Sequence, residues 1–183
     1  WSAFTDLALK SGYKEEFLEK TGLTIKNGSG KKYDRFRGRV MFPIHNLSGR
    51  VIGFGGRVLK KDEKTAKYVN SPESEIYHKS QSLYGIYFAK KAIVQRDNCY
   101  LVEGYTDVIS LHQSGIENVV ASSGTSLTVE QIRLIGRYTK NVTVLYDGDA
   151  AGIKASLRGI DDFARAMPQS SGQTIAAWSP AAT

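Results

Sequence analysis

Two similar blocks in the second half of the chain constrain its fold more than any other feature. The first, at residues 100–107, is an apolar run that ends in Glu103 and is followed by a glycine and Asp107. The second, at residues 142–152, is an apolar run that ends in Asp147-Gly148-Asp149. Each block predicts a buried strand, an acidic tip, a tight glycine turn and then a helix. Strands and helices that alternate through short connections predict a parallel sheet with right-handed crossovers.

The strand tips of such a sheet share one edge, where ligands bind in open α/β sheets. Four carboxylates at this edge (Glu103, Asp107, Asp147 and Asp149) would repel one another unless a hard cation such as Mg²⁺ neutralised them. Glu103 could then be a metal ligand or a general base, because a carboxylate among other acids can have a raised pKa. An isolated Asp-Gly-Asp is more typical of a turn or a helix cap, and the acidic spacing excludes an EF-hand. The repetition in successive strand–helix units favours the metal site.

Charge is divided unevenly between the two halves of the chain. Residues 1–99 contain 19 Lys and Arg against 10 Asp and Glu, which gives +9, whereas residues 100–183 contain 6 against 8, which gives −2. This division predicts a first half that binds a polyanion and a second half that binds metal. The alternative is a charge balance that only keeps the protein in solution. The single cysteine, Cys99, excludes an internal disulfide and is expected in the core.

Arginines alternate with other residues at the start of segment 33–44, at Arg35, Arg37 and Arg39. On a strand this spacing puts the three guanidinium groups on one face, where each can bind two phosphate oxygens. The alternative is an ordinary solvated strand face. A hairpin turn at 46–49 leads into a second strand, whose glycines permit a bulge or the close approach of a ligand.

Lysines lie beside aromatic residues further along the basic half, at Lys67-Tyr68 and at Tyr77-His78-Lys79. Charge next to a stacking surface is common in proteins that bind nucleic acids, although these tyrosines could equally be at the edge of a core. At the N-terminus the pattern predicts two helices, with Ser11 as the cap of the second and Gly22 at its end. Thr128 and Gln131 predict a capping box on a later helix.

The motifs together resemble a known family. The blocks at 103–107 and 147–152 resemble the Toprim signature shared by bacterial primases, topoisomerases and some nucleases. Six further segments resemble parts of the catalytic core of bacterial replicative DNA primases, and they occur in the same order as in that family. They lie at 33–44, 53–57, 67–73, 77–79, 83–85 and 121–125. The resemblance covers residues 1–160. It implies an α/β fold, with a Toprim-type parallel sheet flanked by helices and preceded by a basic α+β subdomain.

The resemblance also implies the domain boundaries. Residues 1–97 would form the basic nucleic-acid-binding subdomain and residues 98–162 the Toprim subdomain. The composition of residues 163–183, rich in Ser, Ala and Gly towards the end, predicts a poorly ordered tail with a weak strand signal at 174–178. The family has a further strand and another acidic pair after the helix that is expected to end at Ile160, so the Toprim subdomain is expected to be incomplete, by truncation or internal deletion. We expect the zinc-ribbon module and the helicase-docking domain of the family to be absent from this chain.

The function that the resemblance implies is metal-dependent synthesis of short RNA primers on single-stranded DNA from ribonucleoside triphosphates, in the bacterial cytoplasm at the nucleoid. Glu103 would be the catalytic acid, Asp147 and Asp149 would bind Mg²⁺ or Mn²⁺, and Asp107 would support them. Zinc would belong only to an upstream domain. Template and nucleotide would be bound by eight residues, Arg35, Arg37, Arg39, Arg57, Lys67, Tyr68, Asn70 and Lys79.

The expected partners are the template, the RNA primer, the nucleotides and, through a C-terminal domain, the replicative helicase; we expect a monomer and no membrane. Two alternatives remain open. One is a fragment of a phage or plasmid primase–helicase. The other is an inactive Toprim module that only binds nucleic acid.

Overall fold

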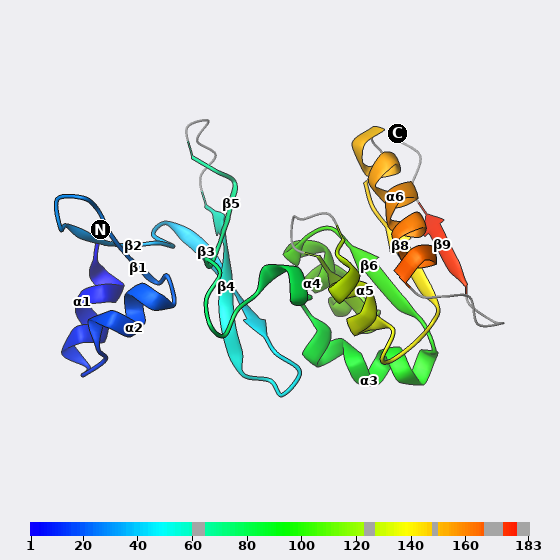
Figure 1. Ribbon diagram of the computed structural model, residues 1–183, viewed down its shortest axis with the longest axis horizontal. Helices are drawn as coiled ribbons and strands as arrows, with labels where there is room; N and C mark the ends of the chain where they lie inside the picture. Colours follow the sequence, from blue (N-terminus) through cyan, green and yellow to red (C-terminus); the bar gives the residue numbers. More distant parts are fainter. Residues whose placement is uncertain (60–64, 123–126, 148–149, 167–173, 179–183) are drawn as a thin grey trace. The chain divides into compact units, whose positions relative to one another are not determined.

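The computed structural model describes residues 1–59, 65–122, 127–147, 150–166 and 174–178. It divides into two compact units (Figure 1). The first contains Trp1–Ile44 and Val51–His78, and the second contains His45–Arg50 and Lys79–Thr183. By its contacts, the turn at 45–50 therefore belongs to the second unit, as does all of the chain from Lys79. The functional boundary expected at residue 97 stays a prediction.

The first unit begins with two short helices, α1 (Ala3–Lys10) and α2 (Glu15–Lys20). The prediction that Ser11 caps the second helix is wrong: Ser11 ends α1, and Lys14 precedes α2. Gly22 lies just after α2, as expected, in the left-handed conformation with φ +68°. This conformation ends a helix at little cost only when the residue has no Cβ.

A two-stranded antiparallel sheet follows, made of β1 (Thr24–Lys26) and β2 (Lys32–Asp34). Asp34 joins this sheet to α1: its carboxylate accepts hydrogen bonds from the backbone N–H groups of Phe4 and Thr5, each at 2.9 Å, and from the Thr5 hydroxyl at 2.7 Å. The first backbone N–H groups of a helix have no acceptor within the helix itself. Asp34 therefore caps α1 from a distant part of the chain.

The second sheet of this unit has the order β3–β4–β5, with β3 at Arg39–His45, β4 at Val51–Val58 and β5 at Tyr68–Asn70. The predicted single strand from residue 33 is wrong, because β2 ends at Asp34 and a turn occupies 35–38. The turn buries Phe36 against β4, where a Cβ on Gly56 would lie 2.6 Å from the Phe36 ring. Gly53 faces the ring of Tyr77 in the same way, at 3.1 Å. These two glycines admit aromatic side chains of the protein itself.

The second unit contains a four-stranded parallel sheet with the order β7–β6–β8–β9 (Figure 1). Its strands are β6 (Cys99–Val102), β7 (Val119–Ala121), β8 (Val142–Leu145) and β9 (Ile175–Trp178). The helices are α3 (Ile86–Arg96), α4 (Tyr105–Gln113), α5 (Val129–Ile135) and α6 (Ala150–Ala166), after a 3₁₀ turn at Lys79–Gln81. Helices α3 and α4 pack on β7, and α6 packs on β8 and β9. The predicted α/β fold with a parallel sheet flanked by helices is confirmed.

Apolar side chains from the strands and helices form the core of this unit. It includes Ile93, Leu101, Val144 and Phe163, all of them inaccessible to solvent. Cys99 is also completely buried, and burial raises the pKa of its thiol, as expected for a core residue. No helix within the described ranges is long and apolar enough to cross a membrane.

The end of the chain differs from the sequence-based prediction. The last helix continues past Ile160 to Ala166, and Phe163 is its most deeply buried described side chain. The weak strand signal corresponds to β9, which pairs with β8 in parallel from Val142↔Ile175 to Leu145↔Trp178. A fourth parallel strand therefore follows the helix, and residues 163–166 and 175–178 have regular structure. Residues 167–173 and 179–183 lie outside the described part.

Candidate active site and nucleic-acid interface

The predicted acidic residues follow adjacent strands of the parallel sheet. β6 and β8 are neighbours, with Leu101 paired to Val144. Two positions further along each strand, this register brings Glu103 level with Tyr146, and Asp147 follows directly. Glu103 is exposed at this edge, whereas Leu101 and Val102 directly before it are buried. The structure therefore brings Glu103 and Asp147 to the same edge of the sheet, as the strand-tip argument predicts.

Asp107 has a structural role at the start of α4. Its Oδ2 accepts a hydrogen bond of 2.9 Å from the backbone N–H of Gly104, the residue that caps the helix. Gly104 is the N-cap of α4. The Asp107 carboxylate thus holds the turn that directly follows Glu103, and this contact uses one of its two oxygens.

A buried tyrosine connects three strand ends at the same edge. Tyr146 follows β8 and is only 7% exposed, and its hydroxyl is hydrogen-bonded to Ser122, which follows β7. Burial raises the pKa of Tyr146 to about 12; the hydrogen bond with Ser122 acts against this increase, and the nearby Glu103 carboxylate adds to it. Tyr146 and Ser122 were not among the predicted site residues. The signal for Ser122 was present, because it is a polar residue directly after a predicted strand.

The backbone of Asp147 lies very close to the beginning of α6. A Cβ on Gly152 would be 2.0 Å from the Asp147 carbonyl oxygen. Only glycine allows this approach, which places Asp147 beside the N-terminal end of the helix. Gly148 and Asp149 lie outside the described residues.

The donor set suits a divalent cation in type, since carboxylate oxygens are the ligands that Mg²⁺ prefers. Within the described ranges, however, no three Asp, Glu, His or Cys side chains come together as a metal site. Glu103 and Asp147 therefore do not complete a site without a further ligand.

The predicted basic residues of the first unit do not share one strand face. Arg35 is half-buried: its Nε donates a hydrogen bond of 2.6 Å to the carbonyl of Gly22, and burial lowers the pKa of its guanidinium. Arg35 thus stabilises the end of α2. Arg37 is exposed in the turn, with its guanidinium 4.5 Å from the ring of Trp1 and 4.9 Å from that of Tyr33.

Three of the predicted residues gather at Tyr68 on β5. Arg57 is its cross-strand partner on β4, with the guanidinium 5.8 Å from the ring centre, and the Lys67 ammonium is 5.9 Å from it. Arg39 lies nearby, since its Nη1 donates to the carbonyl oxygens of Gly56 and Lys67, at 3.2 and 3.3 Å. This group of Arg39, Arg57, Lys67 and Tyr68 combines charge with an aromatic ring, as single-strand-binding surfaces do.

Besides Arg35 and Arg37, two further predicted residues lie outside this group. Asn70 pairs with Gly55 in the β4–β5 register. Lys79 belongs to the second unit, where its carbonyl accepts a hydrogen bond from the buried Gln131 side chain at 3.2 Å. The Gln131 side chain also accepts from the backbone N–H of Thr128, and the Thr128 hydroxyl accepts from that of Gln131, each at 3.2 Å. The predicted capping box is confirmed.

Comparisons with known proteins agree with both halves of the chain. Residues 1–90 match the model of the DNA primase catalytic core, N-terminal domain, and residues 100–174 match the Toprim-like model. A DNA primase of Clostridium acetobutylicum is 48% identical over 161 residues, which are 88% of this chain and 26% of that protein.

Solved primase structures are similar as well. The Aquifex aeolicus primase, described as zinc-binding and RNA polymerase domains, has a TM-score of 0.88 and 38% identity, covering 98% of this chain and 43% of that one. A DnaG primase catalytic domain bound to single-stranded DNA has a TM-score of 0.84 and 43% identity, covering 97% of this chain and 58% of that one.

The chain spans about a quarter of the length of the curated relative. Within that span, however, both domain models match in the same order and almost the whole chain aligns with primase catalytic cores. The chain belongs to the family of bacterial DNA primases and corresponds to part of their catalytic core.

Proposed function

We propose that this chain carries the nucleotidyl-transfer site of a bacterial DNA primase, which makes short RNA primers on single-stranded DNA from ribonucleoside triphosphates. The observation that supports this most directly is the position of Glu103 and Asp147 at the ends of adjacent parallel strands. A carboxylate pair there suits chemistry on phosphates, and the chain is about half identical to DNA primases in this region.

In this proposal Asp147 and Asp149 bind a divalent cation, Mg²⁺ or Mn²⁺, and Glu103 is either a third ligand or the general base. The bound cation would neutralise charge on the nucleotide phosphates. Glu103 would accept the proton of the primer 3′-hydroxyl as it attacks the α-phosphate of the next nucleotide. Asp107 would keep Glu103 in place through its hydrogen bond to Gly104.

The basic group of Arg39, Arg57, Lys67 and Tyr68 is proposed to hold the template and nucleotide phosphates, together with Arg37, Asn70 and Lys79. The role of Arg35 is less direct, because its Nε is occupied by the Gly22 carbonyl. We further propose that the complete protein functions in the cytoplasm at the nucleoid, as a monomer that contacts the replicative helicase. The zinc-binding domain named for the Aquifex protein would be a separate part of such a protein.

Replacement of Glu103 by Gln tests the catalytic assignment. The variant loses a charge at the sheet edge and keeps its side-chain shape, so primer synthesis by the full-length protein should fall by a factor of about 100 or more, as expected for the loss of a general base. Binding of a labelled oligodeoxynucleotide should not change. The measurements are primer synthesis from ribonucleoside triphosphates and fluorescence anisotropy.

Glu117→Gln is the matched control, because Glu117 is an exposed carboxylate just before β7, at the other end of the strand. It should leave synthesis unchanged. Undiminished synthesis in Glu103→Gln would contradict the catalytic role. Template binding without synthesis by the unaltered protein would instead favour an inactive nucleic-acid-binding module.

A further inference from the structure

Three residues form one row across the acidic edge, which is the edge of the sheet at which β6, β7 and β8 end. In the register between β6 and β7, Val102 pairs with Ala121. The next residues of the two strands, Glu103 and Ser122, are therefore level with each other. Tyr146 is level with Glu103 on the other side, by the register between β6 and β8. The carboxylate of Glu103 thus lies in the middle of the row, between two hydroxyl-bearing residues.

The three side chains of the row share one face of the sheet. Side chains at the same level of neighbouring strands point to the same face, and so do side chains two positions apart along a strand. Two positions before the row are three core residues with no exposed surface, Leu101, Val120 and Val144. Tyr146 packs in the same core cluster, which agrees with this placement. The row therefore continues the core of the second unit to the edge of the sheet.

The side chain of Tyr146 crosses the end of β6. Because β7 and β8 lie on opposite sides of β6, their ends are two strand spacings apart, or about 10 Å. The Tyr146 hydroxyl is nevertheless hydrogen-bonded to Ser122. To reach it, the tyrosine must extend across β6 on the face that it shares with Glu103. The contribution of the Glu103 carboxylate to the raised pKa of Tyr146 agrees with this close position.

Burial differs within the row. Ser122 is 3% and Tyr146 7% exposed, whereas Glu103 between them is exposed. The hydrogen bond joins the two hydroxyls in a place that water scarcely reaches, as buried polar groups require. The exposed carboxylate therefore lies beside a ring and a hydroxyl pair that are both fixed in the protein.

The packing of the sheet does not by itself require this hydrogen bond. Phenylalanine and alanine in place of Tyr146 and Ser122 would occupy nearly the same volume. Replacing both partners of a buried hydrogen bond by apolar groups of similar shape is nearly neutral for stability. The hydroxyl pair is therefore better explained by the carboxylate beside it than by the core beneath it.

We propose that Tyr146 and Ser122 are positioning residues for Glu103. Their hydrogen bond holds the tyrosine ring across β6, and the ring restricts the orientations of the Glu103 side chain. This inference rests on the proposed function, in which Glu103 is a metal ligand or the general base. Either role needs the carboxylate at a fixed place, so a small displacement of Glu103 slows the reaction without weakening the binding of template.

Tyr146→Phe removes one hydroxyl and keeps the ring. In the full-length protein, the rate of primer synthesis at saturating nucleotide should fall about tenfold, whereas the KM for nucleotide and the affinity for single-stranded DNA should stay within about twofold. Ser122→Ala should have the same effect. The double variant should be no slower than either single variant, because both changes remove the same hydrogen bond. Ser122→Thr keeps a hydroxyl and should lose less activity than Ser122→Ala.

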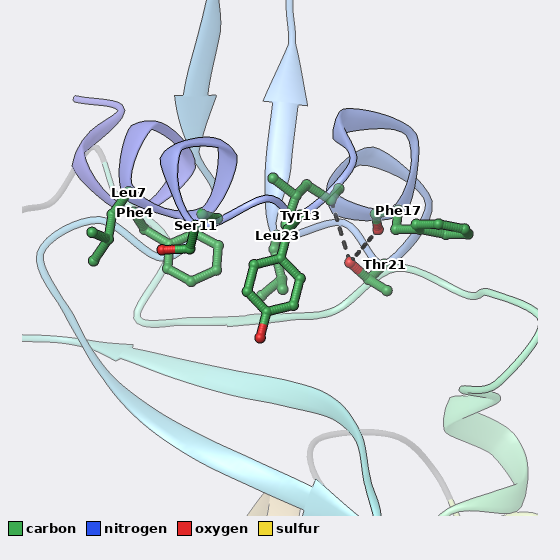
Figure 2. Close-up of a pocket in the computed structure, with 9 residues that line it drawn as sticks. Phe4, Leu7, Ser11, Tyr13, Phe17, Thr21 and Leu23 are labelled. Carbon is green, nitrogen blue, oxygen red and sulfur yellow. Dashed lines mark hydrogen bonds between the residues drawn. The ribbon is translucent and has the colours of Figure 1, made fainter.

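Two other tyrosines provide matched controls. Tyr138→Phe removes a hydroxyl just before β8, at the opposite end of that strand, from a side chain that packs against the same core. Tyr13→Phe removes an exposed hydroxyl in the first unit, where Tyr13 lines an apolar groove between α1 and α2 (Figure 2). Both variants should make primers at the unaltered rate. Circular dichroism checks that each variant is folded, and Ser122→Ala keeps the test valid if Tyr146→Phe is not folded.

The same change in a Glu103→Gln background distinguishes positioning from a purely structural role. If the hydroxyl pair acts through Glu103, Tyr146→Phe should slow the residual synthesis by less than about twofold in this background. A further loss of about tenfold there would overturn the proposal. Unchanged synthesis in Tyr146→Phe and Ser122→Ala, beside a defective Glu103→Gln, would overturn the positioning role alone. Undiminished synthesis in Glu103→Gln would overturn the proposed function, and this inference with it.

Discussion

At the scale of single residues, the acidic edge depends on very close backbone packing. Gly152 lets the start of α6 come against the Asp147 carbonyl, at a distance where any Cβ would overlap the oxygen. Tyr146, Ser122 and Glu103 meet at the neighbouring strand ends. Uncharged residues, Gly152, Tyr146 and Ser122, therefore contribute to the packing around this edge, together with the Asp107 carboxylate that holds the turn after Glu103.

Gly152→Ala should destabilise the second unit, because a methyl group 2.0 Å from the Asp147 carbonyl forces the helix and the strand end apart. We expect the free energy of unfolding to fall by about 3 kcal/mol, as for overpacking against rigid backbone. Urea denaturation followed by circular dichroism measures the change. Gly159→Ala in the same helix is the control: nothing lies within 4 Å of its Cβ, so stability should rise by about 0.5–1 kcal/mol. Equal effects of the two changes would contradict the close approach.

At the scale of elements, α1 is held by a cap that comes from a strand. Burial acts against ionisation of Asp34, but hydrogen bonds from the Thr5 hydroxyl and from the N–H groups of Phe4 and Thr5 outweigh it and lower the pKa of this carboxyl. Because α1 has only eight residues, it is too short to be stable alone and depends on this cap and on its packing.

Asp34→Asn should lower the free energy of unfolding at pH 7 by about 1 kcal/mol, which is typical for the loss of a helix cap. The pKa is lower in the folded state than in the unfolded state, so the charged cap stabilises the fold above the ordinary pKa of the carboxyl, near 4. This stabilisation is lost as pH falls through the folded-state pKa. The difference in free energy of unfolding between the unaltered protein and the variant should therefore shrink below about pH 4, as measured by denaturation at several pH values.

Asp6→Asn is the control on the same helix, where we expect an effect of only a few tenths of a kcal/mol. If the difference in free energy of unfolding between the unaltered protein and Asp34→Asn stayed constant down to about pH 2, the Asp34 carboxylate would not be the charged cap.

At the scale of the whole molecule, charge separates the chain into a basic and an acidic part. The first 99 residues carry +9 and the rest −2. Arg37 and the group at Tyr68 are all in the first unit, and the carboxylates are in the second. This distribution agrees with the proposal that the first unit binds a polyanion and the second binds metal.

Simultaneous replacement of Arg37 and Arg39 by Gln should weaken binding of single-stranded DNA and reduce its salt dependence. If each arginine contacts one phosphate, the slope of log K against log salt should fall by about 1.4, since each contact on a single strand contributes about 0.7. Anisotropy titrations at several salt concentrations measure this slope. The double change Lys91→Gln with Arg133→Gln, two exposed cations of the second unit, should leave it unaltered. An unchanged slope in the Arg37 and Arg39 variant would place the DNA elsewhere.

Much of the second unit could be predicted because its signals are local. Apolar runs of strand length, glycine turns and the capping box at Thr128 each depend on a few consecutive residues, and they were found where the pattern placed them. The end of α6 was missed because Asp161 and Asp162 interrupt the apolar pattern, although the helix continues and buries Phe163 one turn later.

The sequence by itself determined the parallel sheet, the order of its strands along the chain and the position of Glu103 and Asp147 at strand ends, because the side-chain pattern of a strand is read over a few residues. Only the tertiary structure decided which of the predicted side chains are available to a ligand and which are used in contacts within the protein. Arg35 turns inward to Gly22, and Asp34 caps a helix about thirty positions away. Tyr146 reaches Ser122 across the sheet. These contacts join residues far apart in the chain, and such pairs leave no periodic signal in a single sequence.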